Sequence, residues 1–130
     1  MSTIFSKIAA GEIPCYKVAE NEDFLAFLDI FPLVRGHVLV IPKKEVDYLF
    51  DLDQETYSGL MEFARKVALA IVKVIPCKRI GVAVLGLEVP HAHVHLVPLN
   101  SERDIDFSKP KLQLTSEEFA AIAKMISDAM

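Results

Sequence analysis

The sequence predicts an α+β fold in which a five-stranded antiparallel sheet carries helices packed on one face. Two observations lead to this prediction. Helix signals occur at the start, middle and end of the 130-residue chain, with three strand-like segments before the middle helix and two after it. The links between neighbouring strands are short, which favours antiparallel over parallel pairing. The length suits one domain, spanning residues 1–130.

The first half of the chain carries signals for one helix and three strands. Ser2 can cap a short helix that ends at Ala10, and Gly11 can close that helix in the left-handed conformation. Apolar and β-branched segments bounded by turn residues then predict the strands. They are expected at residues 16–19, 23–30 and 37–41, with Pro42 ending the third.

The second half begins with the one long helix. Asp53 is its expected N-cap, and Pro76 ends it. Between them, apolar residues recur every three or four positions, as on the buried face of an amphipathic helix. Strands are expected at residues 79–85 and 91–99, and a polar loop at residues 100–111. Thr115 and Glu118 then form a capping box that opens a final helix.

Composition and charge narrow the class of protein. Hydrophobic residues make up 52% of the chain and charged residues 25%, as in globular proteins. The net charge of −4 offers no broad basic surface for DNA or RNA. The N-terminus lacks a signal peptide, and the longest apolar-rich stretch, residues 67–75, is interrupted by Lys73 and too short for a bilayer. We therefore expect a cytoplasmic protein without nucleic-acid or membrane partners.

The two cysteines fit that compartment. Cys15 and Cys77 lie far apart in the sequence and form no C-x-x-C pair. They are expected to be ordinary buried thiols, although one disulfide between them stays open.

Three histidines alternate with hydrophobic residues in the segment His91-Ala92-His93-Val94-His95. Alternate residues of a strand share a face, so the three imidazoles are expected to point the same way, and the residues between them into the core. Three imidazoles on one face of an apolar strand are hard to explain as structural residues. This histidine row is therefore the first candidate for a functional site.

A metal site is one explanation of the row, because imidazole is the commonest metal ligand. Strand spacing separates neighbouring histidines of the row by roughly 6.7 Å and the outer pair by roughly 13 Å. Zinc needs each nitrogen at about 2.1 Å, so all three fit one ion poorly. A site of two row histidines with His37 or Glu88 stays open, and with it a metal-dependent hydrolase. The prediction that we favour contains no metal.

Nucleophilic catalysis suits the row better. A neutral imidazole can attack phosphorus and form a phosphoramidate intermediate, which water then cleaves. Flanking histidines can fix the tautomer of the nucleophile and donate hydrogen bonds to phosphate oxygens.

The segments around the row resemble the histidine-triad (HIT) family, whose motif alternates histidine with hydrophobic residues. The matching segments follow in order over about the first hundred residues: 4–8, 11–14, 24–30, 36–43 and 91–97. All four histidines of the chain, His37 included, fall at positions that the family uses. The resemblance implies a HIT-like fold that assembles as a homodimer, edge to edge or through the long helix.

The same resemblance implies a nucleotide hydrolase that needs no cofactor. It would act at the α-phosphate of nucleoside phosphoramidates or dinucleoside polyphosphates, through a covalent nucleotidyl-histidine intermediate. His93 would be the nucleophile, His91 would orient it, His95 would contact the phosphate or leaving group, and His37 would support the row. His95 stands where the transferase and phosphorylase branches usually have glutamine, which points to the hydrolase branch.

The resemblance also implies a nucleotide-binding site. Asp29 matches the carboxylate that binds the ribose hydroxyls. Phe5, Ile8, Phe27 and Ile30 match the apolar base pocket. The plainer interpretations are a turn or cap residue for Asp29 and core packing for the other four.

Three features depart from the family pattern. Leu85 stands where many members have asparagine, and the shortened turn after it lacks the usual phosphate donors, with Glu88 near a donor position. Thr3 and Ser6 replace a zinc-binding C-x-x-C pair, so no zinc is expected there. The segment after Asn100 does not resemble the commoner family ends. The first departure keeps a second hypothesis open: a nucleotide-binding or regulatory module with weak activity.

Overall fold

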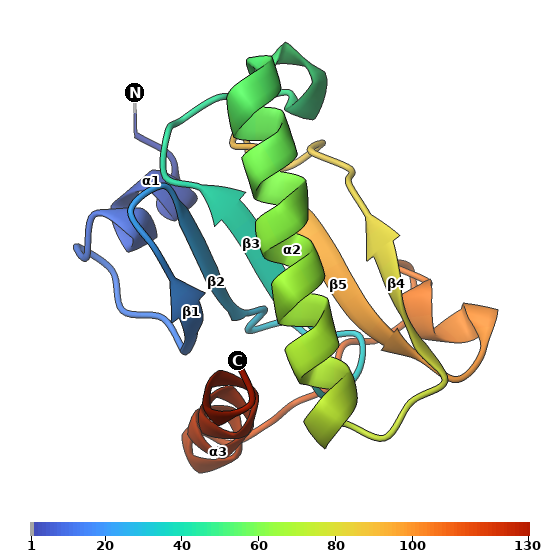
Figure 1. The fold of residues 1–130 in the computed structure, drawn as a ribbon. Helices are drawn as coiled ribbons and strands as arrows, with labels where there is room; N and C mark the ends of the chain where they lie inside the picture. Colours follow the sequence, from blue (N-terminus) through green and yellow to red (C-terminus); the bar gives the residue numbers. More distant parts are fainter. Residues whose placement is uncertain (1) are drawn as a thin grey trace.

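The computed structural model describes residues 2–130 and contains one five-stranded antiparallel sheet (Figure 1). Its strands lie in the order β1-β2-β3-β5-β4. They are β1 (Lys17–Glu20), β2 (Phe24–Leu28), β3 (Val38–Pro42), β4 (Arg79–Ala83) and β5 (Val94–Leu99). The helices are α1 (Ile4–Ala9), α2 (Gln54–Val74) and α3 (Ser116–Asp128), with short 3₁₀ turns at η1 (Leu49–Asp51) and η2 (Glu102–Ile105). The predicted sheet and its antiparallel pairing are confirmed.

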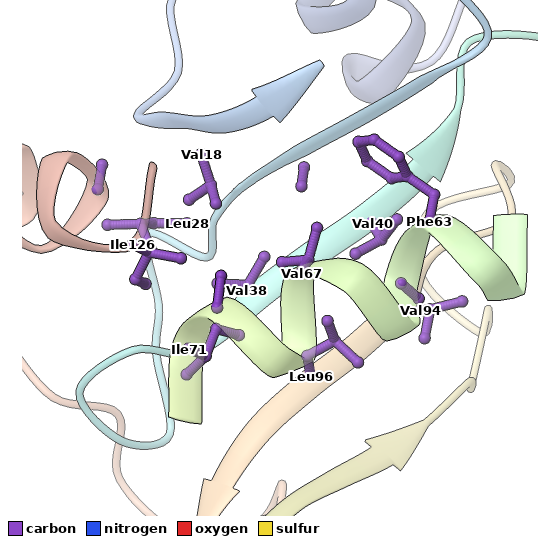
Figure 2. Close-up of a cluster of buried hydrophobic side chains, with 14 of the residues drawn as sticks. Val18, Leu28, Val38, Val40, Phe63, Val67, Ile71, Val94, Leu96 and Ile126 are labelled. Carbon is purple, nitrogen blue, oxygen red and sulfur yellow. The ribbon is translucent and has the colours of Figure 1, made fainter. Parts of the chain in front are cut away.

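The long helix α2 lies across one face of the sheet and buries the main core (Figure 1). Alternate residues of β3 and β5 point toward it, which is the period-two pattern of a strand with one buried face. Figure 2 shows Val67 and Ile71 of α2 beside Val38 of β3 and Leu96 of β5. Helix α3 joins the same core through a buried face that includes Ile126. The predicted one-sided packing holds for these two helices.

The short helix α1 is an exception to that prediction, because it packs on the opposite face. Phe5 joins a second buried cluster with Leu25 and Phe27 of β2 and Leu39 and Ile41 of β3. These strand residues alternate with those that face α2, so the central strands are buried on both sides. The sequence pattern of a strand buried on both faces is a continuous apolar run, and it does not say which helix covers which face.

Side-chain caps fix where the helices begin. Asp53 caps α2 and Thr115 caps α3 through a capping box, both as predicted. Helix α1 is capped by Thr3 rather than by the predicted Ser2. Gly11 follows α1 with φ +81°, the left-handed conformation expected of it.

Strand β5 begins at Val94, three residues later than predicted. Its pairing with β3 ends at Val40 and Val94, and upstream the backbone bonds to other partners. The His91 N–H donates to the carbonyl of Val89 (2.8 Å), and the Ala92 N–H donates to the carbonyl of Val46 (2.7 Å). His91 and His93 therefore lie just before the strand, on a segment tied to neighbouring loops.

The polar loop expected at residues 100–111 contains the 3₁₀ turn η2. A Cβ atom at Gly81 of β4 would lie 2.6 Å from the Leu99 side chain of β5 and 3.2 Å from the Ile105 side chain of η2, so a larger residue at this position requires these side chains to shift. Among residues 2–130, no helix has both the length and the apolar character that a bilayer crossing demands.

Cys15 and Cys77 are half-buried free thiols.

Candidate active site

All four histidines are buried and lie close together on the sheet face that α1 covers. His37 immediately precedes β3, His91 and His93 immediately precede β5, and His95 lies within β5. The ring centroids of His93 and His95 are 5.1 Å apart, and those of His37 and His95 are 5.2 Å apart. The structure thus joins the predicted row to the histidine from the neighbouring strand.

His93 is held by its own neighbour in the chain. Its Nδ1 lies 2.7 Å from the main-chain carbonyl oxygen of His91. A carbonyl oxygen only accepts, so Nδ1 carries the hydrogen and Nε2 of the neutral ring keeps its lone pair. Burial lowers the pKa of His93 below its ordinary value. The ring is therefore a neutral imidazole with Nε2 available as a nucleophile near neutral pH.

His91 is completely buried, and both of its ring nitrogens are engaged. Its Nε2 lies 2.8 Å from the carbonyl oxygen of Pro42, so Nε2 carries the hydrogen. Its Nδ1 lies 3.0 Å from the hydroxyl of Thr3. The edge of the Phe5 ring packs against both His91 and His93.

His37 and His95 are joined by a hydrogen bond in which His37 is the donor. The Leu33 backbone N–H donates to Nδ1 of His37 (3.1 Å), which leaves the hydrogen of His37 on Nε2. That N–H donates to Nδ1 of His95 (2.9 Å), so the hydrogen of His95 lies on its own Nε2. Burial and the neighbouring ring lower the pKa of His37 to about 3. Burial and the adjacent His93 lower the pKa of His95 to about 4. His95 is thus a neutral ring that presents a hydrogen-bond donor.

Asp29 lies at the end of this pair. Its Oδ2 is 3.6 Å from Nε2 of His37, and its Oδ1 accepts a hydrogen bond from the Phe31 backbone (2.8 Å). Burial raises the pKa of the Asp29 carboxyl above its ordinary value. The bond to Phe31 is the turn contact expected of a plain structural aspartate, and Oδ2 stays available to a ligand.

The ligand atoms of Asp29, His37 and His95 all lie within 4.8 Å of one another. Two imidazoles and a carboxylate are a donor set that binds divalent transition metals. Here, however, the facing nitrogens of the two rings are hydrogen-bonded to each other, so an ion would have to break that bond. The cluster differs from the alternative left open by the sequence, because it contains one histidine of the row instead of two and adds Asp29 to His37. Glu88, the other ligand considered from the sequence, is exposed.

The position of Thr3 and Ser6 does not fit a zinc ion. Their hydroxyl oxygens are 2.8 Å apart, the Thr3 hydroxyl also contacts the nearby ring nitrogen of His91, and the Ser6 hydroxyl donates to the Glu45 carboxylate. Zinc in a structural site is held by thiolates, imidazoles or carboxylates. A pair of neutral hydroxyls and an imidazole with both nitrogens engaged do not supply such a set.

The four residues predicted for the base pocket are only partly brought together. Phe5 and Phe27 meet edge to edge, with ring centroids 5.7 Å apart, and Ile8 packs against the same buried cluster. Ile30 is 54% exposed and lies outside that cluster. Phe27 is buried, so in this structure it packs as a core residue as well as lining the region next to the histidines.

A cavity of about 380 Å³ opens beside His93. Its walls are the segment around η1, with Tyr48 and Phe50, and the link between β4 and β5, with Leu85 and Leu87. These four apolar side chains are largely exposed, which is unusual unless they meet a ligand or partner. Tyr48 and Phe50 were not predicted from the sequence as site residues, because two aromatic residues just before a helix cap carry no signal that distinguishes a cavity wall from a loop.

Two further contacts of the histidines were also missed from the sequence. Phe107, inside the expected polar loop, places its ring edge-on against His95, with centroids 4.8 Å apart. Thr3 was considered only as a substitute for a zinc ligand, yet it binds His91. The Thr3–His91 and His95–Phe107 contacts each join two different segments of the chain, and local sequence patterns do not predict such contacts.

Comparisons with known proteins were made for the whole chain. A family model described as the HIT domain matches residues 10–102. A Schizosaccharomyces pombe protein named adenosine 5'-monophosphoramidase hnt1 is 36% identical over 129 residues, which cover 98% of this chain and 97% of that protein.

Solved structures are similar over nearly the full length. A Hit-like protein involved in cell-cycle regulation from Bartonella henselae aligns with a TM-score of 0.86 and 32% identity, over 99% of this chain and 96% of that one. A Zn-bound histidine triad family protein from Mycobacterium smegmatis aligns with a TM-score of 0.80 and 28% identity, over 99% of this chain and 93% of that one.

Proposed function

The chain belongs to the HIT domain family, and from this premise we propose that it is a nucleotide hydrolase that acts through a covalent nucleotidyl intermediate on His93. Its substrates would be nucleoside phosphoramidates or dinucleoside polyphosphates, cleaved at the α-phosphate. The S. pombe relative named as a monophosphoramidase supports this class of reaction. The observation that carries the proposal is the 2.7 Å bond from His93 Nδ1 to the His91 carbonyl, because it leaves Nε2 unprotonated.

The reaction would proceed in two displacements at phosphorus. In the first, the Nε2 lone pair of His93 forms a bond to the α-phosphorus, and the bond from phosphorus to the leaving amine or phosphate breaks. In the second, water attacks the same phosphorus, the bond to His93 breaks, and a nucleoside monophosphate is released. The His93 ring returns to its neutral form. The proton that the attacking water loses replaces the proton that the leaving group took up in the first displacement.

The other histidines would serve these displacements from fixed positions. The Nε2–H of His95 is placed by the bond from His37 and would donate to a phosphate oxygen or to the leaving group. His91 would hold the nucleophile through its carbonyl oxygen. Asp29, with one free carboxylate oxygen, would accept the ribose hydroxyls. Phe5, Ile8, Phe27 and Ile30 would border the base.

We also propose that the protein is a cytoplasmic homodimer. Strand β4 lies at an edge of the sheet, and its Val82 is exposed, as are Leu69 and Val72 on α2. An unpaired edge next to exposed apolar residues favours association with a second copy. Light scattering coupled to size-exclusion chromatography tests this assembly.

The central experiment is hydrolysis of adenosine 5'-phosphoramidate, followed by mass spectrometry of the products. The proposal predicts release of AMP and ammonia by the wild-type protein. His93→Ala abolishes turnover while AMP binding, measured by calorimetry, persists. The exposed residue Lys66, replaced by alanine, is a matched control that keeps full activity. Turnover that survives His93→Ala at the wild-type rate would contradict the mechanism.

A second candidate function is a nucleotide-binding module with weak activity. The observation that favours it is the apolar wall at Leu85 and Leu87, where no side chain can donate to a phosphate. Leu85→Asn adds a donor beside His93. If the missing donor limits the rate, this variant hydrolyses the phosphoramidate several-fold faster than the wild type, whereas tight AMP binding without turnover in both proteins favours the binding module.

A further inference from the structure

The polar cluster at the start of α1 includes an unusual residue. Among residues 2–130, Thr3 is the one buried polar side chain besides the four histidines, with 8% of its surface exposed. Its hydroxyl lies 3.0 Å from Nδ1 of His91, a residue 88 positions later in the chain. A helix cap needs no such partner, so this contact calls for a reason beyond capping.

The direction of the bond follows from the other partners of His91. Its Nε2 carries the hydrogen, because the only group that it meets is the Pro42 carbonyl, 2.8 Å away. In the neutral form of the ring, Nδ1 then has a bare lone pair. The Thr3 hydroxyl must therefore donate to it, since two lone pairs facing each other in a buried site would be unsatisfied.

The surroundings of Thr3 hold its hydroxyl in that orientation. Its oxygen accepts the Ser6 backbone N–H (2.9 Å), and its own backbone N–H donates to a Glu45 carboxylate oxygen (3.0 Å). The Ser6 hydroxyl also donates to Glu45. These two bonds lower the pKa of the Glu45 carboxyl, which keeps it an acceptor at neutral pH. Ser6 Oγ, 2.8 Å from the Thr3 hydroxyl, is the competing acceptor, but it already accepts the Thr3 backbone N–H (3.0 Å). Thr3 is the donor that Nδ1 of His91 meets, so the hydrogen of Thr3 goes to His91.

His91 in turn holds the proposed nucleophile. Both of its ring nitrogens are fixed, by Thr3 and by Pro42, and its carbonyl oxygen accepts the Nδ1–H of His93. Loss of either ring contact would loosen the position of His91 and of the carbonyl that it carries. The Nδ1–H of His93 would then lose its fixed acceptor, the His91 carbonyl oxygen.

We propose that Thr3 is a positioning residue for His93. Its hydroxyl acts together with the Pro42 carbonyl to hold His91 as the Nε2–H tautomer, and His91 holds His93 with Nε2 free. This inference rests on the proposed function for its catalytic consequence, but the tautomer itself can be measured without any substrate.

The test compares three variants for kcat, KM and the ¹⁵N shifts of the histidine rings. Thr3→Val removes the hydroxyl with little change of shape, and Thr3→Ser retains it. Thr115→Val is the control for lost capping, because Thr115 caps α3 through the same kind of capping box and has no histidine partner. The proposal predicts that kcat falls about tenfold or more in Thr3→Val, with KM nearly unchanged, while Thr3→Ser and Thr115→Val stay near wild type.

The ¹⁵N chemical shifts of the histidine rings distinguish a loss of His91 positioning from a general loss of stability. In the wild type, His91 shows an unprotonated Nδ1 and a protonated Nε2. Thr3→Val gives a mixture of tautomers, whereas Thr115→Val does not. The inference is overturned if wild-type His91 carries its hydrogen on Nδ1, or if Thr3→Val matches Thr115→Val in both kcat and ring shifts. A wild type that turns over no phosphoramidate contradicts the proposed function instead, which the wild-type assay alone reveals.

Discussion

Main-chain groups decide which ring nitrogen carries the proton in His37 and His93. For His91 the Pro42 carbonyl acts together with the Thr3 hydroxyl, and for His95 the His37 ring decides. The carbonyls of His91 and Pro42 take the hydrogens of His93 and His91, and the amide of Leu33 sets the orientation of His37. Backbone atoms cannot change their character as donors or acceptors, so these assignments do not depend on pH near neutrality. The proposed nucleophile and the proposed donor are therefore both held in working tautomers before substrate binds.

The pKa of His93 predicts the acid limb of the activity. Because burial lowers this pKa below its ordinary value of 6.5, the ring stays neutral down to lower pH than a free imidazole does. We expect kcat/KM for adenosine 5'-phosphoramidate to be flat from about pH 8 down to 6.5, and to fall only below that value. A limb with its midpoint above 6.5 would count against a neutral, buried His93 as the nucleophile.

The role proposed for Asp29 predicts how the enzyme treats the sugar. Asp29→Asn keeps the size of the side chain and removes the charge that would accept two ribose hydroxyls. We expect KM for the ribonucleotide substrate to rise about tenfold with a smaller change in kcat, and no change for the 2',3'-dideoxy analogue.

Comparing the two sugars provides the control for that variant. If Asp29 serves only the turn contact to Phe31, the substitution raises KM equally for both substrates, and the ribose assignment fails.

At the scale of the elements, the sequence predicted what depends on local chemistry. The Asp53 and Thr115 caps occur where the spacing of polar and apolar residues placed them. Alternation in the histidine row correctly separated the face toward α2 from the histidine face. These features are decided within a few residues of the chain, so a single sequence contains them.

Features decided by distant contacts were predicted less well. The start of β5 lies at Val94 because the preceding backbone bonds to Val46 instead of to β3. Helix α1 packs away from the other helices because Phe5 completes a cluster on the histidine face. The contacts of Thr3 and Phe107 with the histidines join positions about 90 and 12 residues apart, counted from His91 and His95. No periodicity within one segment carries that information.

The segment that contains η2 is expected to shield the His37 and His95 rings from water. Phe107 lies edge-on against His95 and more loosely against His37. In Phe107→Ala, water reaches these rings, so the pKa of His95 rises from about 4 toward its ordinary 6.5. An NMR titration of the His95 ring protons measures the change.

Phe31→Ala is the matched control for this prediction, because Phe31 is an exposed phenylalanine outside the histidine contacts. It should leave the titration of His95 unchanged. If Phe107→Ala leaves it unchanged too, the segment does not shield the pair.

At the scale of the whole molecule, burial of neutral histidines predicts how stability depends on pH. In the unfolded chain His37 and His95 bind protons near pH 6.5, whereas in the folded protein their pKa values are about 3 and about 4. The unfolded state therefore binds more protons as the pH falls below 6.5. The stabilisation is complete above 6.5 and is lost as the pH falls toward 4.

We expect the free energy of unfolding to fall by about 2 to 4 kcal/mol between pH 6.5 and 5. Carboxylates whose pKa is lowered by a partner contribute little in this window. Glu20, for example, is bound by Lys43 and Lys17, which lower its pKa from 4.5 to about 2, so its contribution disappears only at more acid pH. Urea denaturation at several pH values measures the loss. The His95→Gln variant should lose less than the wild type, because the lowered pKa values of His37 and His93 remain, and equal losses in the two proteins would contradict the assignment.

The family assignment and the sheet that carries the histidines follow together from the sequence, the fold and the comparisons. The central chemical claim is that the adenylyl group of the substrate is transferred to His93 before water releases it. The most direct measurement mixes enzyme with excess adenosine 5'-phosphoramidate, quenches in alkali to preserve the phosphorus–nitrogen bond, and maps the peptides by mass spectrometry. The account predicts an adenylyl group on His93 that disappears in the His93→Ala variant. Rapid turnover with no adduct on any histidine, or an adduct on His91 or His95 instead, would contradict it.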